Sequence, residues 1–195
     1  MKPQLVDSQF DEQHGILKNK LGAIDPAELT RKASEYATGR LMLLYEKPVA
    51  GKFDIPHLRA IHCYIFQDIF PWAGDFREVT TSRTNSFGFP PPQFIIPSLE
   101  TIFSALRVEN HLKQLDPDRF ALRAGHYLGE INAVHAFREG NGRAQREFIR
   151  TLALTAGHRL VWTGLEPEEN NHASRVSYAA GDSSALASLI RKRIG

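Results

Sequence analysis

Residues 116–157 read DPDRFALRAGHYLGEINAVHAFREGNGRAQREFIRTLALTAG, a pattern that predicts two helices joined by a glycine-rich loop. Asp116 and Pro117 open the first helix, because an aspartate N-cap followed by proline is a common helix start. The apolar residues that follow recur at steps of three and four, the period of one buried helix face. They are Phe120, Ala124, Tyr127, Ile131 and Val134. The helix should end at His135.

The second helix of this stretch should run from Arg143 to a glycine stop at Gly157. Its buried positions are expected to be Phe148, Ile149 and Leu152. Between the two helices, Gly-Asn-Gly at 140–142 predicts a turn, because glycine adopts backbone angles that are closed to other residues.

Two further helices are predicted on the N-terminal side. Asp25 and Pro26 start one of them, with Glu28 as the acid of a capping box. Its apolar face is expected at Leu29, Ala33, Tyr36 and Leu41. Residues 54–56 start the other, whose buried face is expected at Leu58, Ile61, Ile65 and Phe66. Proline and glycine within 70–74 should end it.

The pattern changes after residue 75. Residues 76–81 and 94–96 contain β-forming residues on either side of a polar, proline-rich segment. A β-hairpin or flap therefore fits 76–96 better than a helix does. Three consecutive prolines at 90–92 exclude a central strand at that point.

Helical pattern resumes over residues 99–111 and returns in a last helical region through Ala185, Leu186, Leu189 and Ile190. The expected fold class is thus mostly α, with one small β-hairpin. A chain of 195 residues can bury one sizeable core, so we expect a single domain over residues 1–195.

Composition and charge are ordinary for a globular protein, with 42% hydrophobic residues, 24% charged residues and a formal net charge of +2. A nearly neutral chain gives no reason to expect nucleic acid or a membrane surface as a partner. No apolar run reaches the length of a membrane span or a signal peptide. Cys63 is the only cysteine, which favours a reducing compartment, and its apolar neighbours predict a buried small residue.

The loop and the helix after it concentrate residue types that bind phosphate. A Gly-Asn-Gly turn that opens a helix points successive N–H groups outward, which makes an anion site at the positive end of the helix dipole. Arg143 and Arg146 are three residues apart and share the helix face next to that turn. Arginine forks match phosphate oxygens, so this arrangement suits a polyphosphate.

Glu139 and His135 add a candidate metal ligand and a candidate base. A carboxylate among these cations could hold Mg²⁺ on phosphate oxygens, and the imidazole could take a proton from an incoming hydroxyl. Each residue alone has a common alternative, since helix-end histidines are often caps and charged helix faces are usually solvated. The joint pattern over twelve positions favours a functional site. The other seven histidines show no metal-ligand spacing and are assigned no role.

The segment HAFREGNGRAQR at 135–146 resembles the Fic-family signature, His-x-Phe-x-Asp/Glu-Gly-Asn-Gly-Arg-x-x-Arg, and matches every defining position. Ala136 is the one departure, at a variable position where proline is usual. FPWAG at 70–74 with FREV at 76–79 resembles the segment that enters the family's flap, and GEINA at 129–133 resembles the helix before the signature.

The resemblance covers a core of about residues 51–190, with an N-terminal helical extension over about 16–46. It implies a Fic-type helical bundle with a β-hairpin flap over the active site. It also implies a protein adenylyltransferase, which moves AMP from ATP-Mg²⁺ to a Ser, Thr or Tyr hydroxyl of a target protein and releases pyrophosphate.

By the same resemblance, His135 is the general base and Glu139 the Mg²⁺ ligand, and Phe137 anchors the loop in the core. The residues implied in phosphate or ATP binding are Arg138, Gly140, Asn141, Gly142, Arg143 and Arg146. The target would dock on the flap by strand addition, through Thr84, Asn85, Ser86 and Phe87.

Other readings stay open. Gly142 favours AMP transfer, because the branch that transfers phosphate carries lysine there. Phosphocholine transfer, de-AMPylation and a non-catalytic Fic-like binding module are alternatives. A helical nucleic-acid-binding domain is disfavoured by the near-neutral charge and the scattered Lys and Arg.

Many family members are inhibited by a helix bearing Ser/Thr-x-x-x-Glu-Gly/Asn, whose glutamate pairs with the second arginine, here Arg146. Residues 8–12, SQFDE, come nearest to this motif, but Gln13 follows and no helical stripe supports them. We therefore expect a separate small antitoxin protein to supply the glutamate. The resemblance implies a topoisomerase ATPase subunit or a small GTPase as the target, and the bacterial cytoplasm or, for a secreted effector, the host cytosol as the compartment.

Overall fold

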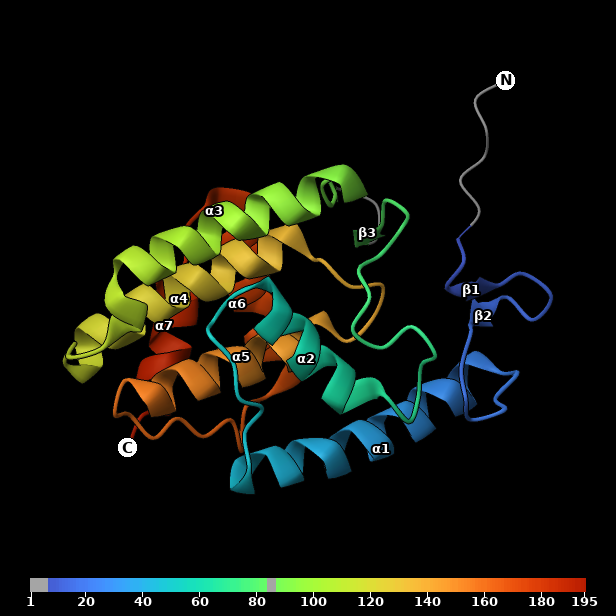
Figure 1. Ribbon diagram of the computed structural model, residues 1–195, viewed down its shortest axis with the longest axis horizontal. Helices are drawn as coiled ribbons and strands as arrows, with labels where there is room; N and C mark the ends of the chain where they lie inside the picture. The colour runs from blue at the N-terminus through green and yellow to red at the C-terminus, as the bar shows by residue number, and fades with distance from the viewer. Residues whose placement is uncertain (1–6, 84–86) are drawn as a thin grey trace.

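The computed structural model describes residues 7–83 and 87–195, and helices dominate it (Figure 1). The α-helices are α1 Pro26–Glu46, α2 Ile55–Phe66, α3 Ile95–Val108, α4 Pro117–Val134, α5 Asn141–Thr155, α6 Pro167–Ala180 and α7 Ser184–Arg191. Short 3₁₀ turns cover Pro92–Phe94 (η1) and Asn110–Leu112 (η2). Two antiparallel strand pairs are present, β1 Phe10–Asp11 with β2 Ile16–Leu17 and β3 Ser82–Arg83 with β4 Phe87–Gly88. None of the helices in the described residues has the length and apolar character needed to cross a membrane.

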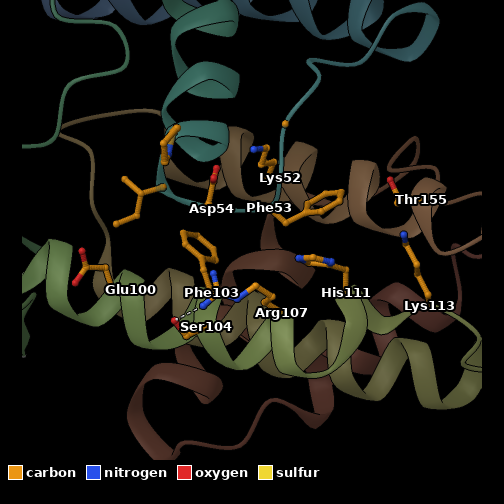
Figure 2. Close-up of a pocket in the computed structure, with 13 residues that line it drawn as sticks. Lys52, Phe53, Asp54, Glu100, Phe103, Ser104, Arg107, His111, Lys113 and Thr155 are labelled. Carbon is orange, nitrogen blue, oxygen red and sulfur yellow. Dashed lines mark hydrogen bonds between the residues drawn. The ribbon is translucent and has the colours of Figure 1, made fainter.

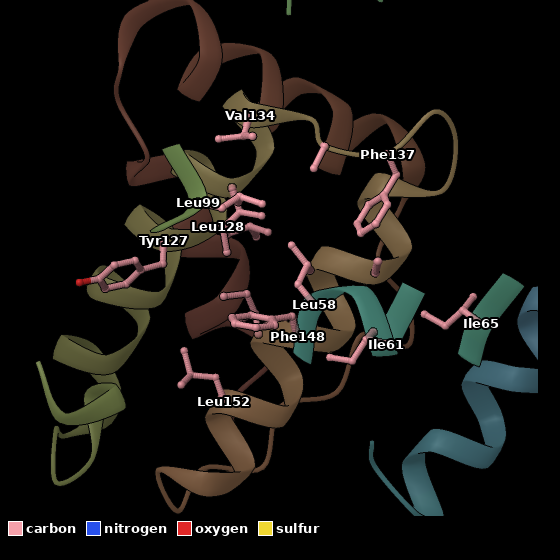
Figure 3. Close-up of a cluster of buried hydrophobic side chains, with 14 of the residues drawn as sticks. Leu58, Ile61, Ile65, Leu99, Tyr127, Leu128, Val134, Phe137, Phe148 and Leu152 are labelled. Atoms are coloured by element: carbon pink, nitrogen blue, oxygen red, sulfur yellow. The ribbon is translucent and has the colours of Figure 1, made fainter. Parts of the chain in front are cut away.

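Helix α4 lies at the centre of the bundle, because it packs against α3, α5, α6 and α7. Helix α2 packs against both α5 and α1, and α1 lies along one edge of the molecule (Figure 1). Large, fully buried side chains fill the core between α2, α4 and α5 (Figure 3): Leu58, Ile61, Tyr127, Phe148 and Leu152. Each such side chain contributes roughly 1.5–3 kcal/mol on burial, so this core fixes the two helices that flank the glycine-rich loop.

Of the helix boundaries expected around that loop, the start and the end of α4 are confirmed. Asp116 caps α4, and its carboxylate accepts hydrogen bonds from two first-turn N–H groups at 3.0 and 3.1 Å. His135 is the C-cap of α4. Helix α5 begins at Asn141, two residues earlier than expected. Gly140 is its N-cap and has a left-handed backbone conformation, so the residue after it can already be helical.

Two expectations about burial are wrong. Tyr36 is 49% exposed, and the buried positions of α1 are Leu29, Ala33, Ala37 and Leu44. These residues are spaced by four, four and seven positions, so they share one helix face, and Tyr36 lies just outside that face. Cys63 is exposed, because the face of α2 that meets the core carries its neighbours Ile61, His62, Ile65 and Phe66.

The β-hairpin is shorter than the sequence predicts. Its register pairs Ser82 with Gly88 and Arg83 with Phe87, and residues 76–81 form no strand. We call residues 79–90, which include this hairpin, the flap.

The expected strand at 94–96 is wrong, since Phe94 ends η1 and Ile95 begins α3. Ile95 is 1% exposed and starts a buried helical stripe that continues through Leu99, Ile102, Phe103 and Leu106. Burial of this stripe outweighs the β propensity of isoleucine. The preceding prolines are compatible with a helix start, because proline is tolerated in the first turn.

Helix α6 is not predicted as a separate helix by the sequence. Its buried side consists of small residues, Ala173, Ser174 and Ser177. The apolar periodicity that marks the other helices is therefore weak here.

Candidate active site

The loop between α4 and α5, residues 135–140, begins and ends in the left-handed region of backbone conformation. His135 has φ 47° and ψ 58°, and Gly140 has φ 81°. A Cβ atom at Gly140 would lie 2.3 Å from the ring of Phe66, so only glycine fits there. His135 adopts a conformation that costs of order 1–3 kcal/mol for a residue with a side chain, and its surroundings must therefore hold it.

The side chain of Asn141 closes this loop from inside. Its Oδ1 accepts a hydrogen bond from the N–H of Phe137 at 2.9 Å, and its Nδ2 donates to the carbonyl of Phe137 at 2.7 Å. Both residues are buried. The hydrogen-bonding groups of the Asn141 side chain are thus used within the loop. A ligand would meet the backbone N–H groups in the first turn of α5, because these groups lack partners within the helix.

A cavity of about 510 Å³ opens at this N-terminus of α5. The loop, α5, the flap and residues 165–171 contribute its lining: Thr81, Phe89, His135, Arg138, Glu139, Gly140, Asn141, Gly142, Arg143, Arg146, Leu165, Pro167, Asn170 and Asn171. All the residues of 135–146 that the sequence suggests for catalysis, phosphate binding or metal binding therefore meet at one cavity. Of the suggested docking residues, Thr84, Asn85 and Ser86 lie outside the described residues, and Phe87 is in β4.

Arg143 and Arg146 concentrate positive charge at the cavity. The guanidinium of Arg143 lies 4.7 Å from the centroid of the Phe66 ring, and burial lowers its pKa. Burial, together with the charge of Arg143, lowers the pKa of Arg146 to about 10, which leaves it protonated at neutral pH. No carboxylate of the described residues forms an ion pair with Arg146, so an anion in the cavity would relieve the repulsion between the two cations.

Glu139 lies at the mouth of the cavity with its side chain 49% exposed. Its Oε1 accepts hydrogen bonds from the N–H of Gly140 at 2.9 Å and from Nη2 of Arg143 at 3.2 Å. These two donors orient the carboxylate toward the N-terminus of α5.

Arg138 also lines the cavity but is paired on the other side with the N-terminal segment. Its Nε donates to Oδ2 of Asp7 at 2.9 Å, and its guanidinium lies 6.0 Å from the centroid of the Phe10 ring. A ligand would have to compete with Asp7 for this guanidinium.

The imidazole of His135 stacks on the flap. Its ring and that of Phe89 are 3.8 Å apart between centroids and within 3° of parallel. Tyr178 of α6 also contacts this part of the flap, because its ring meets that of Phe89 edge to face at 5.4 Å and its hydroxyl donates to the carbonyl of Gly88 at 3.1 Å. The flap therefore helps to set the orientation of the candidate base.

Arg77 is a second contact between flap and loop that the sequence did not reveal. It is 2% exposed, and its guanidinium donates to the carbonyls of His135 at 2.8 Å, Val79 at 3.0 Å, Pro90 at 2.6 Å and Val134 at 3.2 Å. Two of these carbonyls belong to the negative C-terminal end of α4, which favours a cation. Arg77 thus joins both ends of the flap to the backbone of His135. The sequence shows an arginine after a Gly-containing turn, but nothing in it signals burial.

His62 of α2 holds the opposite side of the loop and was assigned no role from the sequence. Its Nδ1 accepts from the N–H of Gly74 at 2.9 Å, so its Nε2 carries the proton and donates to the carbonyl of Glu139 at 3.0 Å. Its ring stacks on Phe137 at 3.8 Å. Burial lowers the pKa of His62 to about 4, which keeps the ring neutral. Its place in the buried stripe of α2, next to Ile61, is the one sequence signal that it is a core residue.

Together the fold and the site define a helical domain that can hold a polyphosphate at the start of α5, with an imidazole beside it. The model of the Fic/DOC family matches residues 52–153, just over half of the chain, and the chain belongs to this family. The expected Fic-type helical bundle with a small hairpin is confirmed.

Curated relatives and solved structures agree with this assignment. The chain is 40% identical over 188 residues to "Protein adenylyltransferase VbhT" of Bartonella schoenbuchensis, covering 96% of this chain but 39% of that protein. It is 36% identical over 177 residues to "Probable protein adenylyltransferase Fic" of Escherichia coli, covering 91% of this chain and 86% of that protein. The crystal structure of the effector BepC from Bartonella tribocorum with bound AMPPNP superposes with a TM-score of 0.89 at 25% identity over 96% of both chains.

Proposed function

We propose that this chain is a protein adenylyltransferase that transfers AMP from ATP to a Ser, Thr or Tyr hydroxyl of a target protein. The observation that carries the proposal is the single cavity in which His135 faces Arg143, Arg146 and the first turn of α5. The names of the two relatives and the ATP analogue bound to BepC support the same substrate class.

The triphosphate is held by the N-terminus of α5. First-turn N–H groups and the helix dipole attract the phosphate oxygens. Arg143 and Arg146 line the same cavity and receive the β- and γ-phosphates, to which they can donate forked hydrogen bonds. Arg138 contributes if a phosphate displaces Asp7.

Glu139 fits a role in holding Mg²⁺. Its carboxylate lines the cavity and lies beside Gly140 at the start of α5, where we expect the β- and α-phosphate oxygens to bind. One carboxylate with phosphate oxygens and water is a common magnesium ligand set. The bound ion would neutralise negative charge on the phosphates and on the departing pyrophosphate.

His135 takes the proton from the target hydroxyl. The hydroxyl oxygen then forms a bond to the α-phosphorus of ATP, the bond from that phosphorus to the bridging oxygen of the β-phosphate breaks, and pyrophosphate leaves. The stack on Phe89 and the hydrogen bond from Arg77 to the His135 carbonyl hold the imidazole for this step.

The target protein docks on the flap. A two-stranded antiparallel pair leaves backbone edges that a target segment can extend by main-chain hydrogen bonds. Thr84, Asn85, Ser86 and Phe87 lie at or between these strands in the sequence. The target class is a topoisomerase ATPase subunit or a small GTPase, and the site of action is the bacterial cytoplasm or the host cytosol.

A separate antitoxin protein controls the enzyme by placing a glutamate on Arg146. Arg146 has no carboxylate partner among the described residues. Residues 8–12, which come nearest to the inhibitory motif, include strand β1 and form no helix.

The test is a transfer assay with α-³²P-ATP, Mg²⁺ and bacterial lysate. The wild type should label a protein band, and His135→Ala should not, while both bind ATP with similar affinity by calorimetry. A parallel reaction with labelled CDP-choline separates AMP transfer from phosphocholine transfer. Equal labelling by wild type and His135→Ala would contradict the base assignment, and ATP binding without any labelling would favour a binding module.

A further inference from the structure

A second cavity, of about 630 Å³, lies at the opposite end of α5 from the loop (Figure 2). Thr155, the last residue of α5, lines it, whereas the first turn of α5 lines the nucleotide cavity. A helix of this length spans about 22 Å. The two cavities are therefore separate sites. We call the second one the α3 cavity, because the C-terminal half of α3 forms one wall and residues 51–56 form the other.

The floor of the α3 cavity is aromatic and continuous with the core. Phe53 and Phe103 are 6% and 5% exposed, and their rings pack on Phe148 at centroid distances of 5.6 and 5.3 Å. The ring of His111 lies 5.4 Å from that of Phe53. A flat apolar group that enters the cavity could pack against the edges of these rings.

Cations form the rim. Lys52, Arg107 and Lys113 line the cavity, and none of them forms an ion pair with a carboxylate of the described residues. Arg107 has a long hydrogen bond to Oγ of Ser104 at 3.4 Å. In Figure 2, Arg107, His111 and Lys113 follow one another along one wall, and Lys52 approaches from the other.

Two acids also line the cavity, so that its lining carries three cations and two carboxylates. The carboxylate of Asp54 caps α2 and accepts a hydrogen bond from the N–H of His57 at 3.0 Å. Glu100 stands at the far end of the cavity from Lys113 (Figure 2). Burial, with added repulsion from Lys113 and Arg107, lowers the pKa of His111, which is the response expected of a base in a positive field.

The backbone around the α3 cavity is strained. Among the described residues, the non-glycine residues with positive φ are His135 at the nucleotide cavity and five others: Phe53, Asn110, His111, Leu112 and Gln114, with φ between 50° and 66°. Two of the five line the cavity and the other three adjoin His111 or Lys113 in the sequence. Three successive left-handed residues are rare, because each costs roughly 1–2 kcal/mol. Such strain is concentrated at functional sites.

From these observations we propose that the α3 cavity binds a small anion attached to an aromatic ring. The ring packs against Phe53, Phe103 and His111, and the phosphate or carboxylate pairs with the cations of the rim. Arg107 and Lys113 supply most of the charge recognition, since they stand on the same wall as His111. The proposed site is separate from the nucleotide cavity, because no residue lines both cavities.

The test uses amide chemical shifts of ¹⁵N-labelled protein titrated with phenyl phosphate, benzoate and, as a cationic control, benzylamine. Phenyl phosphate should produce saturable shifts at residues 52–55 and 103–113. The variant Arg107→Gln/Lys113→Gln should weaken binding about tenfold, because it removes two charge-assisted contacts. The control variant Lys18→Gln/Lys47→Gln changes the net charge equally at exposed positions outside the cavity and should leave the affinity unchanged.

Benzoate shows which anion the cavity prefers. If benzoate and phenyl phosphate produce comparable shifts, any aromatic anion binds. If benzoate produces weaker shifts, the cavity prefers a phosphate ester. The proposal is overturned if benzylamine produces the same shifts, if the shifts fail to saturate, or if both double variants bind equally. Lys52→Gln, on the other wall, provides an independent variant should Arg107→Gln/Lys113→Gln fail to fold.

Discussion

The loop at 135–140 and the flap at 79–90 meet at His135 but are held in different ways. The loop is closed by buried hydrogen bonds to Asn141 and His62. The flap has two-residue strands and is fixed to the loop through Arg77 and Phe89. The groups proposed to hold phosphate are thus preorganised by the core, while the surface proposed to receive the target is anchored at its ends. Four variants test this contrast.

The largest effect is expected from Gly140→Ala. The added Cβ would meet the Phe66 ring at 2.3 Å in a left-handed backbone, so the loop must shift, and a displacement of about 1 Å can cost about 100-fold in rate. We expect a loss of transfer activity of that size together with weaker ATP binding. Gly157→Ala is the matched control, because Gly157 also has positive φ but a Cβ there would meet nothing within 4 Å. Equal losses in both variants would show that backbone strain, not the clash in the loop, is responsible.

Arg77→Met should break the link between flap and loop while leaving the phosphate site intact. Four carbonyls lose their donor, so we expect kcat/KM for the target protein to fall about tenfold or more. The affinity for ATP should change less than about threefold. Arg119→Met is the control, because that side chain is 78% exposed. An equal fall in ATP affinity would mean that Arg77 supports the whole site and not the flap in particular.

Phe89→Leu removes the ring that stacks on His135 at 3.8 Å and keeps an apolar side chain in place. An aromatic pair contributes about 0.5–1.5 kcal/mol beyond burial, so kcat should fall roughly two- to tenfold with ATP affinity unchanged. Steady-state kinetics with ATP and the target protein measure both. Phe89→Tyr, which preserves the stack, should retain most of the activity. If Phe89→Leu turns over at the wild-type rate, the stack does not orient the base.

The last variant tests the stability of the fold and its dependence on pH. Burial holds the pKa of His62 at about 4, below its ordinary value of 6.5, so the unfolded chain binds a proton more readily between these values. The contribution of His62 is therefore complete above pH 6.5 and is lost as the pH falls toward 4, by up to about 3 kcal/mol. Urea unfolding of the wild type and His62→Gln at pH 7.5 and pH 4.5 measures it. The stability difference between the two pH values should be smaller in His62→Gln, and an unchanged difference would contradict the assignment.

Local signals made two features predictable: the central helices and the meeting of the candidate site residues at one cavity. The capping pair Asp116-Pro117 and the stripe from Phe120 to Val134 gave the limits of α4. Arg143 and Arg146 share one face of α5, and His135 and Glu139 lie in the short loop just before it, so all four line one cavity without any long-range information.

The sequence-based predictions were wrong or incomplete where tertiary packing determines the local structure or the partners of a side chain. The β-formers at 94–96 became helical because Ile95 is buried against the bundle, and α6 escaped notice because small residues make up its buried face. Arg77 and His62 could not be identified because their partners lie 58 and 77 residues away in the sequence. A sequence pattern shows which residues share a helix face but not which carbonyls surround a buried donor.

The exposure of Cys63 has a practical consequence. It is the single cysteine of the chain, it lies on the outer face of α2, and it directly follows His62, whose ring touches the loop. A thiol-reactive fluorophore can therefore be attached at one defined position without any mutation. Because the label would sit next to His62, titration with ATP can test whether its emission reports nucleotide binding in the unmodified sequence.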